Sequence, residues 1–291
     1  MTVLEGEAQP RQLPQPDEVL DQAADENFTV ASLIVGRRQQ AHLKAIYGFA
    51  RLVDDVGDEA VGDRNALLNE IDAELDRIYS HRKVVDALHP LMAKLAVSVH
   101  ECSFPEHSLR RLVQANRQDQ VVTRYETFDE LLAYCRLSAA PVGELVLHVF
   151  GHATLDRIEL SDRVCAGLQV TEHLQDIAED LERGRIYMPR EDLLACGCDP
   201  EDPIGSPPAA RRALTELESY RALGLLAAGI PLKRSLPLRS GVAVAGFVAG
   251  GRSALSELER AQFKPQRKGT NRSRRRTLAF AVTFLRTLAG R

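Results

Sequence analysis

The sequence lacks the cysteine pattern of a disulfide-stabilised secreted protein. Its five cysteines are an odd number and are scattered between Cys102 and Cys198, whereas a disulfide framework typically has an even, regularly spaced set. Cys196 and Cys198 have no second Cys pair and no His at zinc-ligand spacing. We therefore expect reduced thiols and a cytoplasmic protein. The polar lead-in of residues 1–24 also lacks the pattern of a signal peptide.

Long hydrophobic runs are absent as well. The most apolar stretch, Ser240 to Gly251, is shorter than the roughly 20 residues that a membrane-spanning helix needs. The net charge of −4 gives no general attraction to nucleic acid. A basic segment at 263–277 carries seven Lys and Arg residues and no acid. Its ordinary interpretation is a solvated segment, and the alternative is contact with a phosphate-rich partner or, peripherally, with the anionic surface of the inner membrane.

The sequence has no run of alternating strand residues, no hairpin signal and no internal repeat. Apolar residues instead recur at helical spacing in almost every segment, for example at Leu43, Ile46 and Val53. This pattern predicts an all-α protein of about eight to ten helices. We expect residues 25–291 to form one domain, with the basic segment preceding its last helix.

Two acidic clusters stand out against this helical background. Asp54 pairs with Asp58, and Asp176 pairs with Asp180, each at a spacing of i, i+4 that puts both carboxylates on one helix face. Such like-charged pairs weaken an isolated helix by a few tenths of a kcal/mol. One interpretation is two facing helices whose carboxylates hold Mg²⁺, and through it a diphosphate. The other is two acidic surface turns balanced by arginines, and spacing alone leaves both open.

Neighbouring residues favour the metal–diphosphate interpretation. Arg51 precedes the first cluster by one helical turn, and Arg183, Arg185 and Tyr187 follow the second. Arginine suits this role because its planar guanidinium grips phosphate oxygens in a bidentate manner. No GxGxxG motif follows a predicted strand, so there is no nicotinamide-binding fingerprint.

The segments AIYGFARLVDDVGDE and GLQVTEHLQDIAEDLERGRIYMP resemble the two signature regions of the squalene/phytoene synthases. These enzymes act on isoprenyl diphosphates in head-to-head reactions. The resemblance runs from about Asp25 to Leu193. It implies a single-domain isoprenoid-synthase fold, an all-α helical bundle around a central cavity, with an isoprenoid diphosphate as substrate and Mg²⁺ as cofactor.

The resemblance also implies a set of site residues. Asp54, Asp58, Asp176 and Asp180 match the family's Mg²⁺-binding aspartates, and Asp55 and Glu179 lie within the same motifs. Arg51, Arg185 and Tyr187 match residues near the diphosphate, and Tyr47 and Gln169 match positions that line the cavity. A carbocation is also stabilised by aromatic faces. The candidates for that role, each with plain core packing as the alternative, are Phe28, Tyr47, Phe49, Tyr134 and Phe150.

The segments ENFTVAS and VGELVLHVFG are most similar to the bacterial HpnC-type branch. That branch implies ionisation of presqualene diphosphate and capture of water to give hydroxysqualene, in squalene and hopanoid biosynthesis. A separate synthase would supply presqualene diphosphate, and a separate flavoenzyme would reduce the alcohol to squalene. Glu172 occupies a position where the condensing members commonly have an amide, and an acid there alters the metal shell or places a base near the carbocation.

Two alternatives remain open at this point. One is a condensing synthase that makes presqualene diphosphate, squalene or phytoene from farnesyl or geranylgeranyl diphosphate. The other is a helical scaffold without enzymatic activity, which accounts for amphipathic helices but not for two matched acidic faces with arginines close by.

Overall fold

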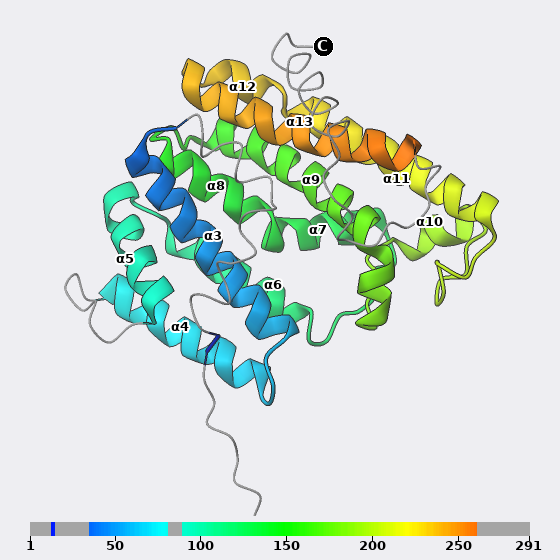
Figure 1. Ribbon diagram of the computed structural model, residues 1–291, viewed down its shortest axis with the longest axis horizontal. Coiled ribbons are helices and arrows are strands. Elements are labelled where there is room, and N and C mark those ends of the chain that lie inside the picture. Colours follow the sequence, from blue (N-terminus) through cyan, green and yellow to red (C-terminus); the bar gives the residue numbers. More distant parts are fainter. Residues whose placement is uncertain (1–12, 15–34, 81–88, 261–291) are drawn as a thin grey trace, which may run out of the picture.

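The computed structural model describes residues 13–14, 35–80 and 89–260 (Figure 1). Phe28 and the basic segment 263–277 lie outside the described residues, as does the lead-in 1–24 apart from Leu13 and Pro14. The helices are α3 (Arg37–Asp58), α4 (Arg64–Ser80), α5 (Pro90–Cys102), α6 (Glu106–Gln118), α7 (Phe128–Ser138), α8 (Ala140–Val149), α9 (Leu155–Glu182), α10 (Arg190–Ala195), α11 (Pro208–Gly229), α12 (Pro231–Ser235) and α13 (Leu238–Arg260). Within these ranges the only extended pairing is an isolated bridge between Arg124 and Ile186. The all-α prediction is confirmed.

The helices pack around two hydrophobic clusters. The first lies among α3, α4, α5 and α8 and contains fully buried side chains such as Phe49, Ile71 and Leu95. The second lies among α7, α9, α11 and α13 and includes Leu131 and Val170. Helices α3 and α9 pack in different clusters, and each has acidic residues at its carboxyl-terminal end. Those two ends are where the predicted site residues are concentrated.

Helix α9 is held in place mainly by α11. Gly167 of α9 lies so close to α11 that an added Cβ would come 2.9 Å from Leu226 Cγ and 3.0 Å from the Ala222 carbonyl oxygen. A side chain at this position would push the two helices apart, because the obstruction includes backbone. The glycine of the GLQ triplet therefore sets the position of α9, and with it the position of the acidic motif two turns further on.

The most apolar stretch of the sequence forms the middle of α13. Gly241, Val244 and Val248 are buried there, and α13 packs against α9, α11 and α12. Its apolar character therefore serves the core of the domain. None of the helices in the described ranges is both long and apolar enough to cross a lipid bilayer.

Helix α3 follows from its apolar periodicity and ends beside α6. Leu43, Ile46 and Val53 are buried, as their spacing predicts. The last turn is stabilised from outside, because Arg64 donates to the carbonyl oxygens of Asp58, at 2.8 Å, and Ala60, at 3.1 Å. These bonds satisfy carbonyl groups that a helix end leaves without intrahelical partners.

The turn after α9 returns the chain towards the site. Gly184 adopts a φ of 77°, a left-handed conformation that glycine tolerates at no steric cost. The Arg185 amide then donates to the Asp180 carbonyl oxygen at 2.8 Å, and the Ile186 amide donates to the Thr123 carbonyl oxygen at 2.9 Å. The segment from Arg185 to Tyr187 is thereby fixed against the loop before α7.

Candidate active site

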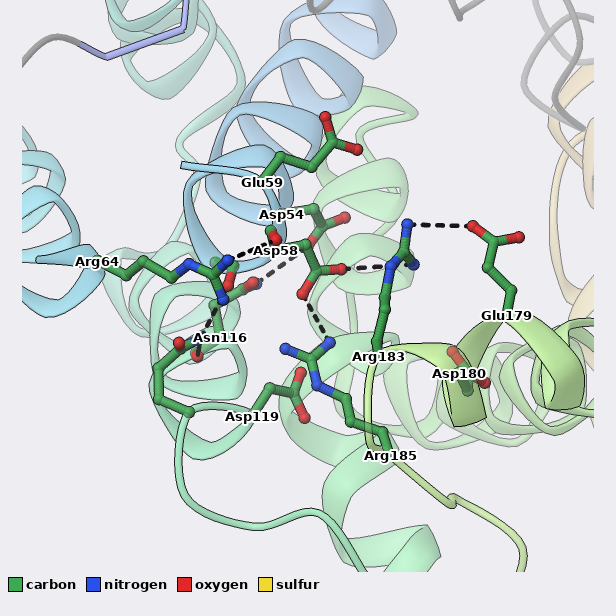
Figure 2. Close-up of polar contacts among 12 residues, drawn as sticks. Asp54, Asp58, Glu59, Arg64, Asn116, Asp119, Glu179, Asp180, Arg183 and Arg185 are labelled. Atoms are coloured by element: carbon green, nitrogen blue, oxygen red, sulfur yellow. Dashed lines mark hydrogen bonds and ion pairs between the residues drawn. The ribbon is translucent and has the colours of Figure 1, made fainter. Parts of the chain in front are cut away.

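The acidic end of α3 presents its carboxylates in two directions. Asp54 and Asp58 lie one turn apart and face the end of α9 (Figure 2). Asp55 is buried and forms an ion pair with Arg51, with 2.8 Å between Arg51 Nε and Asp55 Oδ1. Arg51 also lies 3.7 Å from Glu59. The predicted diphosphate-binding Arg51 is thus held by one acidic residue of its own helix and by the acidic residue that caps it.

Asp54 is poised between charged and neutral forms. Its side chain is open to solvent, yet the surrounding protein removes enough water to raise its pKa to about 7, and the negative charge of Asp58 adds to the rise. Asn116 of α6 opposes the shift by donating to Asp54 Oδ1 at 2.9 Å. A carboxylate that is both crowded by its neighbour and reachable from solvent is one that a cation stabilises.

Two arginines join the acidic end of α3 to the acidic end of α9. Arg183 lies 3.8 Å from Asp58 and 3.1 Å from Glu179, so it spans the two motifs (Figure 2). Arg185, which is buried, lies 2.6 Å from the other oxygen of Asp58. The structure therefore brings together two acidic motifs that are 122 positions apart, measured from Asp54 to Asp176.

The charges at these helix ends oppose the helix macrodipole. Neither α3 nor α9 has a basic residue in its last turn, although the carboxyl-terminal end of a helix favours cations by about 0.3–1 kcal/mol each. Both helices end instead in carboxylates. Arg183 and Arg185, which compensate Asp58 and Glu179, come from the segment after α9, and this unfavourable arrangement is typical of a binding site.

The donor chemistry of the two motifs fits Mg²⁺. Asp54 and Asp58 on one side, and Asp176 and Asp180 on the other, offer only carboxylate oxygens, which Mg²⁺ prefers. Within the described ranges, no group of three or more His, Cys, Asp or Glu side chains converges closely enough to hold a metal ion by itself. Water and diphosphate oxygens would have to complete the coordination, as Mg²⁺ commonly requires.

Next to the acidic residues lies a cluster of aromatic rings. Tyr187 stacks on His173 with 3.9 Å between ring centroids, and Tyr134 lies 5.4 Å from Tyr187. Tyr125 also stacks against Tyr187, with 5.9 Å between ring centroids. Burial is the main cause of the raised pKa of Tyr187, so its hydroxyl stays protonated. The candidates Tyr134 and Tyr187 therefore belong to one aromatic cluster beside the carboxylates.

Sequence reasoning missed the residue that ties this cluster together. Asp119, at the end of α6, accepts hydrogen bonds from Tyr134 Oη at 2.6 Å and from Tyr187 Oη at 3.2 Å. Burial raises its pKa, and the two hydroxyls and Arg185 oppose that rise. Sequence reasoning also missed Asn116, which donates to Asp54. Asn116 lies in the amphipathic helix α6 and Asp119 caps it, and each is a single polar residue without the repeated spacing that made the acidic motifs visible.

The remaining predicted residues lie on the same two helices. Tyr47 is buried on α3, one turn before Arg51. Gln169 Nε2 lies 3.3 Å from His173 Nε2 on α9. Glu172 is exposed one turn before Asp176.

The other aromatic candidates have different surroundings. Phe49 is fully buried and Phe150 is buried, and both belong to the first hydrophobic cluster. Plain core packing is therefore what the structure shows for these two. Phe28 lies outside the described residues.

The all-α fold and the paired acidic motifs agree with the resemblance to the squalene/phytoene synthases, a class of enzymes that act on isoprenyl diphosphates in head-to-head reactions. Residues 22–277 match the squalene/phytoene synthase family, and the chain belongs to that family. A hydroxysqualene synthase from Rhodopseudomonas palustris is 37% identical over 213 residues, which cover 72% of this chain and 70% of the relative. A phytoene synthase from Mycobacterium bovis is 29% identical over 79% of this chain and 76% of the relative.

A solved structure of similar sequence has the same fold. The squalene synthase HpnC from Alicyclobacillus acidocaldarius superposes with a TM-score of 0.76 at 37% identity, covering 85% of this chain and 92% of that one. The isoprenoid-synthase fold is thereby confirmed. The chain is an enzyme of this type, and the scaffold alternative is rejected.

Proposed function

We propose that this enzyme catalyses the Mg²⁺-dependent ionisation of presqualene diphosphate and the capture of water to give hydroxysqualene. The observation that carries the proposal is the meeting of the two motifs, where Arg183 joins Asp58 to Glu179 and Arg185 approaches Asp58. Carboxylates and guanidiniums in one place can bind a metal–diphosphate pair. The choice of reaction is supported by the 37% identity to a hydroxysqualene synthase.

The chain's own residues would bind the leaving group from two sides. Asp54 and Asp58 on α3, with Asp176 and Asp180 on α9, would hold Mg²⁺. The metal supplies Lewis-acid stabilisation of the departing diphosphate. Arg185 would exchange Asp58 for phosphate oxygens, since a guanidinium binds either partner in the same geometry. Arg51 would also bind phosphate oxygens if its ion pair with Asp55 opened.

Ionisation breaks the carbon–oxygen bond, and the diphosphate leaves with the electron pair. The carbocation that remains gains stabilisation from nearby aromatic faces, up to about 2 kcal/mol each when water is excluded. We assign this role to the rings of Tyr134 and Tyr187, which belong to the aromatic cluster beside the carboxylates. Water adds its oxygen to the cation and gives up one proton. Glu172, exposed one turn before Asp176, is the candidate acceptor of that proton.

The proposed reaction requires one enzyme that makes its substrate and another that consumes its product. One enzyme must supply presqualene diphosphate, and a flavoenzyme must reduce the alcohol to squalene in squalene and hopanoid biosynthesis.

We also propose peripheral contact of the basic segment 263–277 with an anionic inner-membrane surface, which suits an enzyme whose product is a thirty-carbon alcohol.

The test is a product assay on purified protein with Mg²⁺. Presqualene diphosphate and farnesyl diphosphate are supplied in separate reactions. Hydroxysqualene from the first and no product from the second supports the proposal. Presqualene diphosphate or squalene from farnesyl diphosphate, or phytoene from geranylgeranyl diphosphate, would show a condensing synthase instead.

Matched variants separate the site from the fold. Asp58→Asn and Asp176→Asn should each abolish most turnover while far-ultraviolet circular dichroism stays unchanged. Glu159→Gln is the control, because Glu159 lies on α9 as well and pairs with Arg163 at 2.6 Å. It is 20 residues before Glu179, which is about 30 Å along a helix. This control should retain full activity.

A further inference from the structure

Asp119 occupies an unusual place beside the proposed reaction centre. It is buried, and it lies at the carboxyl-terminal cap of α6 rather than in either acidic motif. A buried carboxylate is costly unless hydrogen bonds and opposite charge compensate it. Here two phenol hydroxyls donate to it, one to each oxygen, at 2.6 Å and 3.2 Å. The compensation comes from the side chains that the reaction would use.

The hydroxyls come from separate parts of the chain. Tyr134 belongs to α7, and Tyr187 follows the turn after α9. The Asp119 carboxylate therefore links three segments at one point. Arg185 supplies the opposite charge and lies between Asp58 and Asp119 in Figure 2. Removing the carboxylate would release both phenols and alter the electrostatic environment of Arg185 at once.

We propose, on the basis of the function proposed above, that Asp119 is a positioning residue that fixes the Tyr134 and Tyr187 rings towards the carbocation. A phenol that donates to a carboxylate is held at one torsion of its hydroxyl, and its ring gains electron density. A more electron-rich ring face binds a passing cation more strongly, because cation–π attraction follows the negative charge of the face. Asp119 thus acts through two rings and touches no reacting atom.

The arrangement predicts a specific change in kinetics. In Asp119→Asn the phenols lose their charged acceptor, and a ring misplaced by about 1 Å costs about 100-fold in rate. The value of kcat should fall by a factor of that order. KM should stay unchanged or fall slightly, because Arg185 then lacks one neighbouring negative charge and can bind diphosphate more freely. Asp119→Glu, which keeps the charge, should recover part of kcat.

Tyrosine emission gives a readout that does not depend on turnover. The sequence contains no tryptophan and six tyrosines, so its intrinsic fluorescence reports tyrosine alone. A phenol hydrogen-bonded to a carboxylate is quenched, and Asp119→Asn should raise the emission. Asp192→Asn is the matched control, because Asp192 is equally buried but pairs with Arg221. It should leave both emission and kcat at their wild-type values.

A double-mutant cycle tests whether Asp119 acts through the phenols. In a Tyr134→Phe, Tyr187→Phe background, Asp119→Asn should cause no further loss of kcat, since residues that act as a unit are not additive. If the losses multiply, or if emission does not change on removal of the carboxylate, the proposal is wrong.

Further outcomes keep this inference separate from the proposed function. Should Asp119→Asn fail to fold, Tyr134→Phe alone decides, since it must lower kcat with little effect on KM, and an unchanged kcat would overturn the role. If wild-type protein does not consume presqualene diphosphate, the proposed reaction fails. The emission change would then still support the anchoring of the phenols by Asp119, and its absence would refute it.

Discussion

Gly57 gives a quantitative test of how α3 and α6 build the site. It lies in the last turn of α3, and a Cβ added to it would come 2.1 Å from Asn116 Oδ1 and 2.9 Å from Asn116 Cγ. These distances are too short, so Gly57→Ala must displace the Asn116 side chain. Asn116 donates to Asp54 at 2.9 Å, and the displacement breaks this bond.

Two opposing effects decide the stability of Gly57→Ala. Alanine in a helix is favoured over glycine by about 0.8–1.0 kcal/mol. A hydrogen bond to a charged group contributes about 1.5–3 kcal/mol, and we take the lower part of that range because Asp54 is open to solvent. The loss exceeds the gain, and we expect net destabilisation of about 1 kcal/mol. Urea unfolding measures this difference.

The Asn116→Ala background removes the amide group, which is the main obstruction, and supplies the control. There the added Cβ meets only the Cβ of residue 116, at 3.2 Å, which a shift of a few tenths of an ångström relieves. Gly57→Ala should then stabilise the protein by most of the helical preference of about 1 kcal/mol. The sign of the effect should therefore reverse between the two backgrounds. If Gly57→Ala stabilises the wild-type protein as much as it stabilises Asn116→Ala, the reasoning from this contact is refuted.

Two further predictions concern pH and salt. Glu218 is fully buried, and burial raises its pKa above the ordinary 4.5. The folded state therefore keeps a proton that the unfolded state releases, so stability should fall as pH rises above 4.5. Glu218→Gln should flatten this fall in urea unfolding, and an unchanged slope would contradict the assignment. Binding to anionic vesicles through segment 263–277 should weaken as salt rises, and salt-independent binding would exclude a charge-driven contact.

Much of the fold was predictable because it depends on local periodicity. The spacing of Leu43, Ile46 and Val53 determines which face of α3 is buried, and no contact from elsewhere is needed to see it. The same spacing rule placed Asp54 and Asp58 on one face. It also separates Asp55 from them, since an adjacent residue points about 100° away on a helix of 3.6 residues per turn, here towards Arg51.

The parts that sequence could not predict depend on contacts between distant segments. Asp119 meets Tyr134 and Tyr187, which are 15 and 68 positions away, and Asn116 meets Asp54 across 62 positions. A single Asp or Asn carries no period that would mark it. Only the packing of α6 between α3 and α7 shows that these residues complete the site.

The partners of Asp58 indicate that metal and diphosphate bind together. In this structure Arg183 and Arg185 neutralise Asp58. Mg²⁺ alone would have to displace them and break the ion pair of the buried Arg185 with Asp58, leaving it only the more distant charge of Asp119 among these carboxylates, which is costly. Diphosphate alone would meet the uncompensated negative charge of Asp54 and Asp58. When both are present, Mg²⁺ takes the carboxylates and the arginines take the phosphates, so every charge keeps a partner.

This exchange predicts positive coupling between Mg²⁺ and inorganic pyrophosphate. Coupling between two ligands is reciprocal and commonly amounts to about 1–3 kcal/mol, and a ligand that binds only the folded state raises Tm. The rise in Tm with both ligands should therefore exceed the sum of the rises with each alone. Asp58→Asn should abolish the excess, whereas Glu159→Gln should retain it. Strictly additive shifts in the wild-type protein would show that the arginines do not exchange partners.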